Sequence, residues 1–404
     1  MGSVVLLLIL NGLPVQAPTT GAGSLVVTEG DFLAAFGPEH PAWQAIEGGV
    51  MEAEADVRRA DTLPNPTVAF GREAPEGLPA ENTWLLAWTP PLDGRRGPTR
   101  DAAAAGLRAA RARRSADHLS ARGELRRAYA EWAVAVFRVN LVASHVRRLE
   151  RTAEVLGRRA ESGEASGLAA RRIELSAGEA RVRLARAEAD RARAVAAVRG
   201  LWPALPEGAQ PELPEVAAPP AAADVSARPD LVALDERVRQ AELQAKAAGR
   251  YWGFPEIAFG WQTLRGEALS LDGPVLSVSW SVPLFDRDQG RRAAAEGRAR
   301  VLAARHTLAH TRAAAEVEGA RAAHVALAAA ARRAAESART AETVVRGTLA
   351  AFEAGEVNVT DLNDSLRAAF AAEIQALELR GEALGAERAL EAALGRVIGT
   401  GGVR

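Results

Sequence analysis

Two long stretches of this sequence contain almost nothing that would break a helix. Residues 95–160 and 289–353 each run for about 65 residues, and at about 1.5 Å per residue each helix would be about 100 Å long. A globular domain has no use for such lengths. In the first stretch, apolar residues recur in steps of four and three with one three-residue slip, at Leu125, Tyr129, Trp132, Val136, Val139, Val142, Val146, Leu149, Ala153 and Leu156. This heptad seam predicts a helix that packs along its length against neighbours.

The chain contains two copies of one plan. Pro91-Leu92 recurs as Pro283-Leu284, and the run from Ser162 to Ala165 recurs from Ala354 to Val357, both shifted by 192 positions. Two independent markers with one offset indicate an internal duplication. Each half has the pattern helix, strand, strand, very long helix, helix.

The duplication divides the chain into segments. We predict a first repeat over 28–200 and a second over 229–398, joined by a Pro- and Ala-rich linker, 201–228, that lies outside the helices. Residues 1–27 contain an apolar run and are interpreted as a signal or N-terminal segment, and 399–404 as a C-terminal tail. In each repeat, the shorter helices together nearly equal the long one. They are therefore expected to stack end to end and antiparallel beside it.

Two β-hairpins are predicted, at 66–91 and 255–283. In the second, Leu276, Val278, Trp280 and Val282 alternate with serines, which gives one apolar and one hydroxylated face. Alternation alone favours the core of a small soluble β-domain, and only the long helices reverse that preference. Trp84, Trp88, Trp261 and Trp280 on the predicted strands resemble the aromatic belts of membrane barrels. Four strands cannot close a barrel, so several chains would have to contribute, and three would give twelve strands.

Composition argues against several classes of function. Fifty basic and 51 acidic residues leave a formal charge of -1, which gives no field to attract nucleic acid. There is no Cys and no phosphate-binding, nucleophile-elbow or HExxH motif, so we expect neither an enzyme nor a cofactor. His306 and His310 lie one helical turn apart, but no carboxylate is obviously placed to complete a metal site. We therefore predict no catalytic or metal-binding residues.

Several short motifs, in their order and spacing, resemble the TolC-type outer membrane factor (outer membrane efflux protein) family. They comprise residues 63–66 (LPNP) before the first strand, 91–97 (PLDGRRG) after the second, 283–286 (PLFD) in the repeat, and 355–357 (GEV) followed by 360–362 (TDL). The resemblance covers about residues 28–398, and its compact length is most similar to the heavy-metal efflux branch. It implies a mainly α-helical trimer in which a 12-stranded transmembrane β-barrel continues into a long coiled-coil tunnel.

The resemblance also implies functional positions. Gly163-Glu164 and Gly355-Glu356-Val357 would form the periplasmic tips of the tunnel, where an adaptor docks; as an alternative, the glycines only end helices. Asp361 and Asp364 would line the narrowest point of the pore, or Asn358 and Asp361 would only cap a helix. The first repeat has Ala169 and Arg171-Arg172 where an acid is expected, which leaves a mixed acidic and basic gate open.

The function implied is a passive export duct in the bacterial outer membrane that extends into the periplasm. Its partners would be two further copies of the chain, outer membrane lipid, a periplasmic adaptor (membrane fusion) protein and an inner-membrane pump, in a tripartite efflux system (RND-type or similar) or a type I secretion system. The alternative is a soluble periplasmic coiled-coil scaffold, which explains the helices but not two Trp-bearing hairpins at equivalent places.

Overall fold

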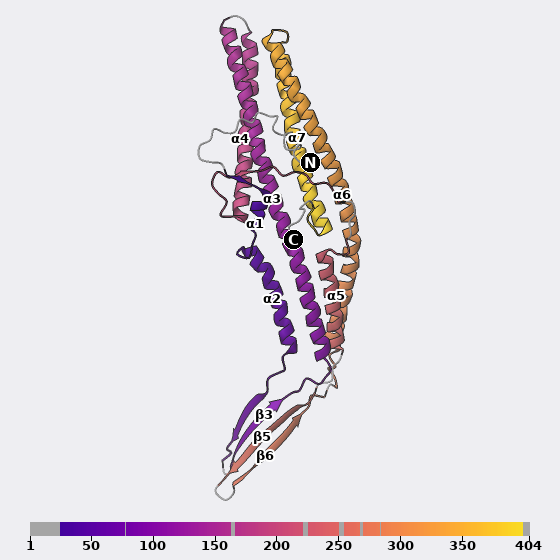
Figure 1. Cartoon of the computed structure of the whole chain (residues 1–404). Coiled ribbons are helices and arrows are strands. Elements are labelled where there is room, and N and C mark those ends of the chain that lie inside the picture. The colour runs from indigo at the N-terminus through magenta and orange to yellow at the C-terminus, as the bar shows by residue number, and fades with distance from the viewer. Residues whose placement is uncertain are drawn as a thin grey trace, which may run out of the picture.

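The protein is an elongated molecule of long helices with a small β-sheet at one end (Figure 1). The computed structural model describes residues 25–76, 78–162, 166–220, 225–249, 254–266, 270–282 and 284–398. Its helices are α1 (Glu29–Ala34), α2 (Pro41–Asp61), α3 (Arg96–Glu161), α4 (Gly167–Leu201), α5 (Pro229–Ala248), α6 (Gln289–Glu353) and α7 (Val359–Leu394). Its strands are β1 (Val26–Val27), β2 (Thr67–Glu73), β3 (Ala80–Trp88), β4 (Gln210–Pro211), β5 (Glu256–Arg265) and β6 (Ser270–Ser279).

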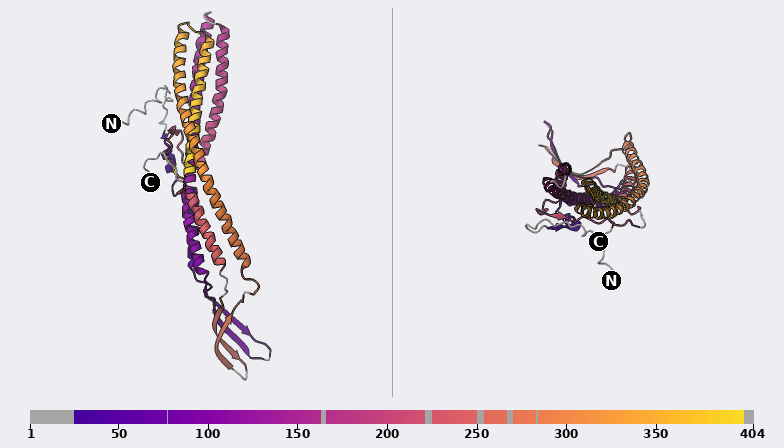
Figure 2. Two further views of the ribbon diagram at one scale, coloured as in Figure 1. Left: turned by 90° about the vertical axis from the view of Figure 1, so that its right-hand side faces the viewer. Right: turned by 90° about the horizontal axis from the view of Figure 1, so that it is seen from above.

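The predicted order of elements is observed in both repeats. The long helices α3 and α6 have 66 and 65 residues and run most of the length of the molecule. Helices α2 and α4 lie one after the other beside α3, and α5 and α7 do the same beside α6 (Figure 1). Seen from above, the helices form an open arc rather than a closed bundle (Figure 2). We call the level where α2 meets α4, and α5 meets α7, the equator.

Local sequence explains where the shorter helices begin. Pro41 and Pro229 occupy the first turns of α2 and α5, where the missing N–H costs nothing. The Ser166 side chain accepts a hydrogen bond from the Leu168 N–H at the start of α4. At the other end of α7, Gly395 adopts a left-handed conformation with φ of 66°, which glycine tolerates without strain.

The sheet at the far end pairs the two repeats. Its order is β2-β3-β5-β6, all antiparallel, so β3 of the first repeat lies directly beside β5 of the second. The register places Trp84 opposite Trp261 and Leu86 opposite Phe259. A separate short parallel pair, β1 with β4, joins the N-terminal segment to the linker at the equator.

The packed cores lie in the upper half of the molecule, away from the sheet. The largest buried cluster joins four helices, with Leu149 of α3, Ile173 of α4, Val345 of α6 and Leu366 of α7 among its members. The predicted seam of α3 is buried from Leu125 to Leu156, with Ala153 partly buried. By contrast, α2 buries none of its side chains fully within the protomer. Among the described residues, no helix is both long enough and apolar enough to span a membrane.

Candidate functional site

The turn between α6 and α7 forms one tip of the helical end. Gly355 has φ of 78°, a left-handed conformation that costs L-residues with side chains about 1–2 kcal/mol. Its N–H donates to the Phe352 carbonyl at 3.1 Å, and the Glu356 N–H donates to the Ala351 carbonyl at 2.8 Å. This is a Schellman ending, so Gly355 does end the helix. Glu356 is exposed at the tip and Val357 is half-buried.

The equivalent turn of the first repeat contains Gly163 and Glu164, which lie outside the described residues. On the second repeat, the Asn358 side chain accepts a hydrogen bond from the Asp361 N–H at 3.0 Å, as a helix N-cap should. The capping role of Asn358 is therefore present. It does not use the carboxylates of Asp361 and Asp364, both of which are exposed on the protomer.

Basic residues of the first repeat lie beside the start of α7. The Arg172 guanidinium donates to the Thr360 hydroxyl at 3.1 Å, and Arg367 pairs with Glu179 of α4 at 3.0 Å. Arg172 stands 192 positions before Asp364, at the equivalent place of its repeat. The structure thus brings Arg172 of the first repeat next to the first turn of α7, where Asp361 lies. A role of Arg172, Asp361 and Asp364 in a pore stays a prediction.

One face of the four-stranded sheet is apolar and exposed. Because directly paired residues point to the same face, the register collects a continuous set there, at Val68, Phe70, Trp84, Leu86, Trp88, Ile257, Phe259, Trp261, Leu276 and Val278. All of them are exposed, Trp84 by 55% and Trp261 by 47%. Towards the hairpin tips, the same face becomes polar, with Asn82 opposite Thr263 and Arg72.

The four tryptophans of the predicted belt lie at two levels along the sheet. Trp84 and Trp88 are four residues apart on β3, about 13 Å along the strand. The apolar band of a membrane barrel is about 25 Å tall. Trp84 and Trp261 lie at the polar edge of the apolar face, whereas Trp88 and Trp280 lie closer to the helices. The role of these tryptophans as a membrane belt stays a prediction.

The opposite face of the sheet is smaller and more polar. Gln262 donates to the Glu81 carboxylate at 2.5 Å across β5 and β3. Ala258 is buried, and a Cβ at Gly260 would come within 1.9 Å of the Trp84 carbonyl oxygen. Only small residues fit at these positions because the strands approach closely there.

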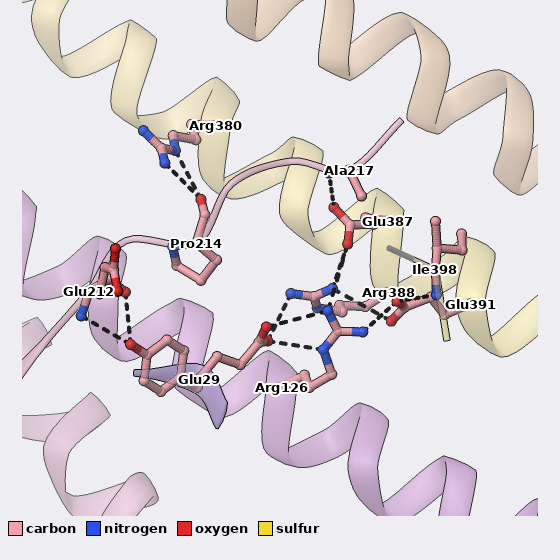
Figure 3. Close-up of polar contacts among 11 residues, drawn as sticks. Glu29, Arg126, Glu212, Pro214, Ala217, Arg380, Glu387, Arg388, Glu391 and Ile398 are labelled. Carbon is pink, nitrogen blue, oxygen red and sulfur yellow. Dashed lines mark hydrogen bonds and ion pairs between the residues drawn. The ribbon is translucent and has the colours of Figure 1, made fainter. Parts of the chain in front are cut away.

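A buried ion cluster at the equator was not predicted from the sequence. It contains Glu29 of α1, Arg126 of α3, and Glu387, Arg388 and Glu391 of α7 (Figure 3). Arg126 contacts all three carboxylates, donating to Glu391 and, at 3.0 Å, to Glu29. Burial alone would lower the pKa of Arg126, but its hydrogen bonds to Glu29 and Glu391 raise the pKa above its ordinary value.

Side chains of the second repeat hold the linker beside this cluster. The Arg380 guanidinium donates to the Leu213 and Pro214 carbonyls at 3.0 and 2.8 Å (Figure 3). Glu387 accepts from the Ala217 N–H at 2.8 Å, and His324 lies 2.9 Å from the Ala217 carbonyl. The linker therefore lies against the helices and is fixed through its backbone.

A signal for these residues existed in the sequence. The seam of α7 follows steps of four and three through Leu366, Phe370, Glu373, Leu377, Arg380, Leu384, Glu387, Glu391 and Leu394. Four charged residues thus occupy positions that a coiled coil normally fills with apolar ones. Glu373, Glu387 and Glu391 are buried. Charges at seam positions predict buried ion pairs because an unpaired charge there would be very costly.

The histidine pair stands apart from these sites. The His306 and His310 rings have centroids 4.5 Å apart on α6, and His306 Nε2 lies 3.8 Å from an Asp235 carboxylate oxygen of α5. In the described ranges, no group of three or more His, Cys, Asp or Glu side chains is arranged to hold a metal ion.

Comparison with known proteins matches one repeat of the chain to a family model. Residues 225–396, nearly the whole second repeat, match the model of the family described as outer membrane efflux protein. The second repeat thus matches the outer membrane efflux protein family. The resemblance seen in the short motifs is therefore confirmed. A member of such a family serves efflux in the outer membrane, so the predictions that the protein is not an enzyme and that it belongs to that membrane are confirmed as well.

Solved structures extend the likeness in fold to nearly the whole chain. CusC, described in terms of transmembrane channel formation, superposes with a TM-score of 0.74 at 17% identity, covering 93% of this chain and 95% of its own. VceC of Vibrio cholerae gives 0.71 at 17%, covering 91% and 96%. The MtrE channel of Neisseria gonorrhoeae, in its open state, gives 0.73 at 19%, covering 93% and 94%. No match was found among curated protein sequences.

Proposed function

We propose that three copies of this outer membrane efflux protein form one closed duct, with a 12-stranded barrel in the outer membrane and a helical tunnel in the periplasm. The observation that carries the proposal is the four-stranded sheet with one exposed apolar face. An apolar patch of this kind on a protein surface marks a membrane or protein contact.

The edges of the sheet support closure by further copies. Among the described strands, β2 and β6 have a neighbour on one side only. Unpaired edges carry exposed N–H and C=O groups, which lipid cannot satisfy. Pairing β6 of one copy with β2 of the next would be antiparallel, like the other pairs, and a head-to-tail contact of this kind closes into a ring.

The number of copies follows from the need for a lumen. Two copies would give eight strands, and the interior of such a barrel is just filled by side chains. Three copies give twelve, which is the smallest closed set that leaves an open path. The arc of helices agrees with this, because α2 buries no side chain fully within its own protomer and requires neighbours.

The helical end supplies the proposed gate and docking tips. Around a threefold axis, exposed Asp361 and Asp364 would bring up to six carboxylates to one constriction, which would favour cations. The tips at Gly163-Glu164 and Gly355-Glu356-Val357 would contact the hairpins of a periplasmic adaptor, which connects the duct to an inner-membrane pump. Transport is passive in the duct itself, since the pump supplies the energy.

Light scattering of the detergent-extracted protein tests the proposal. We expect a trimer that forms ion-conducting channels in planar bilayers. As a matched control, Phe259→Arg places a charge on the apolar face and should prevent insertion, whereas Gln262→Arg places it on the opposite face and should insert. A monodisperse monomer that keeps its β-structure would overturn the trimeric duct and favour the scaffold interpretation.

A further inference from the structure

The helices of the protomer lie in four columns, namely α3, α6, α2 followed by α4, and α5 followed by α7. The last two columns are interrupted at the equator. Helix α4 ends at Leu201 beside the start of α2, where His40 Nε2 lies 3.1 Å from the Leu201 carbonyl. Helix α7 ends beside the start of α5, where Arg228 donates to the Ala393 carbonyl at 3.0 Å. Only α3 and α6 pass this level unbroken, and the lower helices are inclined to the upper ones (Figure 2). The wall of the molecule can therefore bend most easily here.

The N-terminal segment 25–36 covers the first of these breaks. Phe32, fully buried, packs against Trp202 at the end of α4, with ring centroids 5.8 Å apart. Phe36 packs against Trp43 of α2 at 5.6 Å. One short segment thus contacts the helices on both sides of the break. The Tyr129 hydroxyl holds it to the linker, lying 2.7 Å from the Val27 carbonyl and 2.9 Å from that of Glu212.

Glu29 connects the same segment to the equatorial ion cluster (Figure 3). One of its carboxylate oxygens accepts from Arg126 at 3.0 Å and from Arg388 at 2.8 Å. Without Glu29, the cluster would still contain two arginines and two glutamates and would be neutral. Glu29 is also the most exposed member, at 21% of its side chain. It can therefore leave without stranding a net charge inside the protein, and among the three carboxylates it lies nearest to solvent.

We propose that residues 25–36 form an equatorial clasp: they hold the upper and lower halves of the wall at a fixed angle, with Glu29 as the part that engages the cluster. When the clasp is released, the wall bends at the two breaks while each half keeps its own packing. This role does not depend on the tip gate, since it concerns the middle of the molecule.

Pulsed dipolar EPR on the full chain tests the clasp. The chain has no Cys, so labels can be placed at will. Exposed Met51 of α2 and Leu175 of α4 lie on opposite sides of the break, about 54 Å apart along the helix axes. Labelled chain is diluted with unlabelled chain so that distances within one protomer dominate. The double variant Phe32→Ala/Phe36→Ala should at least double the width of this distance distribution, and Glu29→Gln should widen it by less.

Control measurements separate the clasp from a general loss of stability. A label pair at Val155 and Val182, both above the equator, should keep its width in the clasp variants. Val345→Ala, which weakens the upper core, should leave the pair across the break unchanged. An unchanged distribution across the break, equal widening of both pairs, or a Glu29→Gln distribution identical to wild type would overturn the proposal. Light scattering of the same samples reports separately whether the trimer forms.

Discussion

His145 should make the upper half of the protein sensitive to acid. Its ring is 3% exposed and stacks on Phe370 of α7, with centroids 4.1 Å apart. Burial, acting together with the nearby charges of Arg148, Arg183 and Arg367, lowers the pKa of His145 to about 4. The folded protein therefore keeps this histidine neutral where an unfolded chain would protonate it.

The sign and size of the effect follow from linkage. Between pH 6.5 and about 4, the unfolded state binds a proton at His145 and the folded state does not, so the free energy of unfolding falls as the pH falls. One pKa unit corresponds to about 1.4 kcal/mol, which makes the contribution about 3 kcal/mol. The stability is fully present above pH 6.5 and is lost by about pH 4.

Urea unfolding of wild type and His145→Phe, followed by circular dichroism from pH 7.5 to 4, measures this contribution. Phe keeps the stacking on Phe370 but cannot titrate. Burial raises the pKa of Glu373 despite its contact with Arg148. This shift makes the free energy of unfolding rise as the pH falls, opposite to the effect of His145. Because both proteins retain Glu373, it does not affect the difference between them. We expect the stability of wild type relative to the variant to fall by about 3 kcal/mol across the range. Parallel pH profiles for the two proteins would refute the reasoning.

Three further predictions concern the tip and the equator. Changing Asp361 and Asp364 together to Asn should remove cation preference and block by a trivalent ion in planar bilayers. The melting temperature should stay nearly unchanged, because the Asn358 cap uses neither carboxylate; persistent block would exclude them as the gate. Gly355→Val should cost about 1–2 kcal/mol in thermal unfolding and abolish export while the trimer still forms, because φ there is 78°; full export would remove this tip from docking. Arg126→Met should cost about 3–5 kcal/mol in chemical unfolding because it leaves Glu391 buried and less compensated; a loss under 1 kcal/mol would contradict that view of the cluster.

The sequence determined the local architecture. Helix lengths and ends follow from residues within one or two turns, such as the prolines at Pro41 and Pro229 and the cap at Asn358. The α3 seam from Leu125 to Leu156 was readable because heptad spacing places those residues on one side of any helix. The tip glycine at 355 was equally local, since a helix reversal favours a residue with φ above zero.

Only the tertiary structure decided which distant groups meet. Alternation separates the two faces of each hairpin, but it does not say that β3 pairs with β5 or that Trp84 lies opposite Trp261. Arg126 and Glu391 are 265 residues apart, and no local pattern selects that partner among the many charges of the chain. The seam of α7 contains charges at core positions, a signal that the sequence analysis did not use. Their partners, and the N-terminal segment that joins them through Glu29, were fixed only when folding brought both repeats and the linker together at the equator, because contacts across such separations depend on the closure of the whole chain.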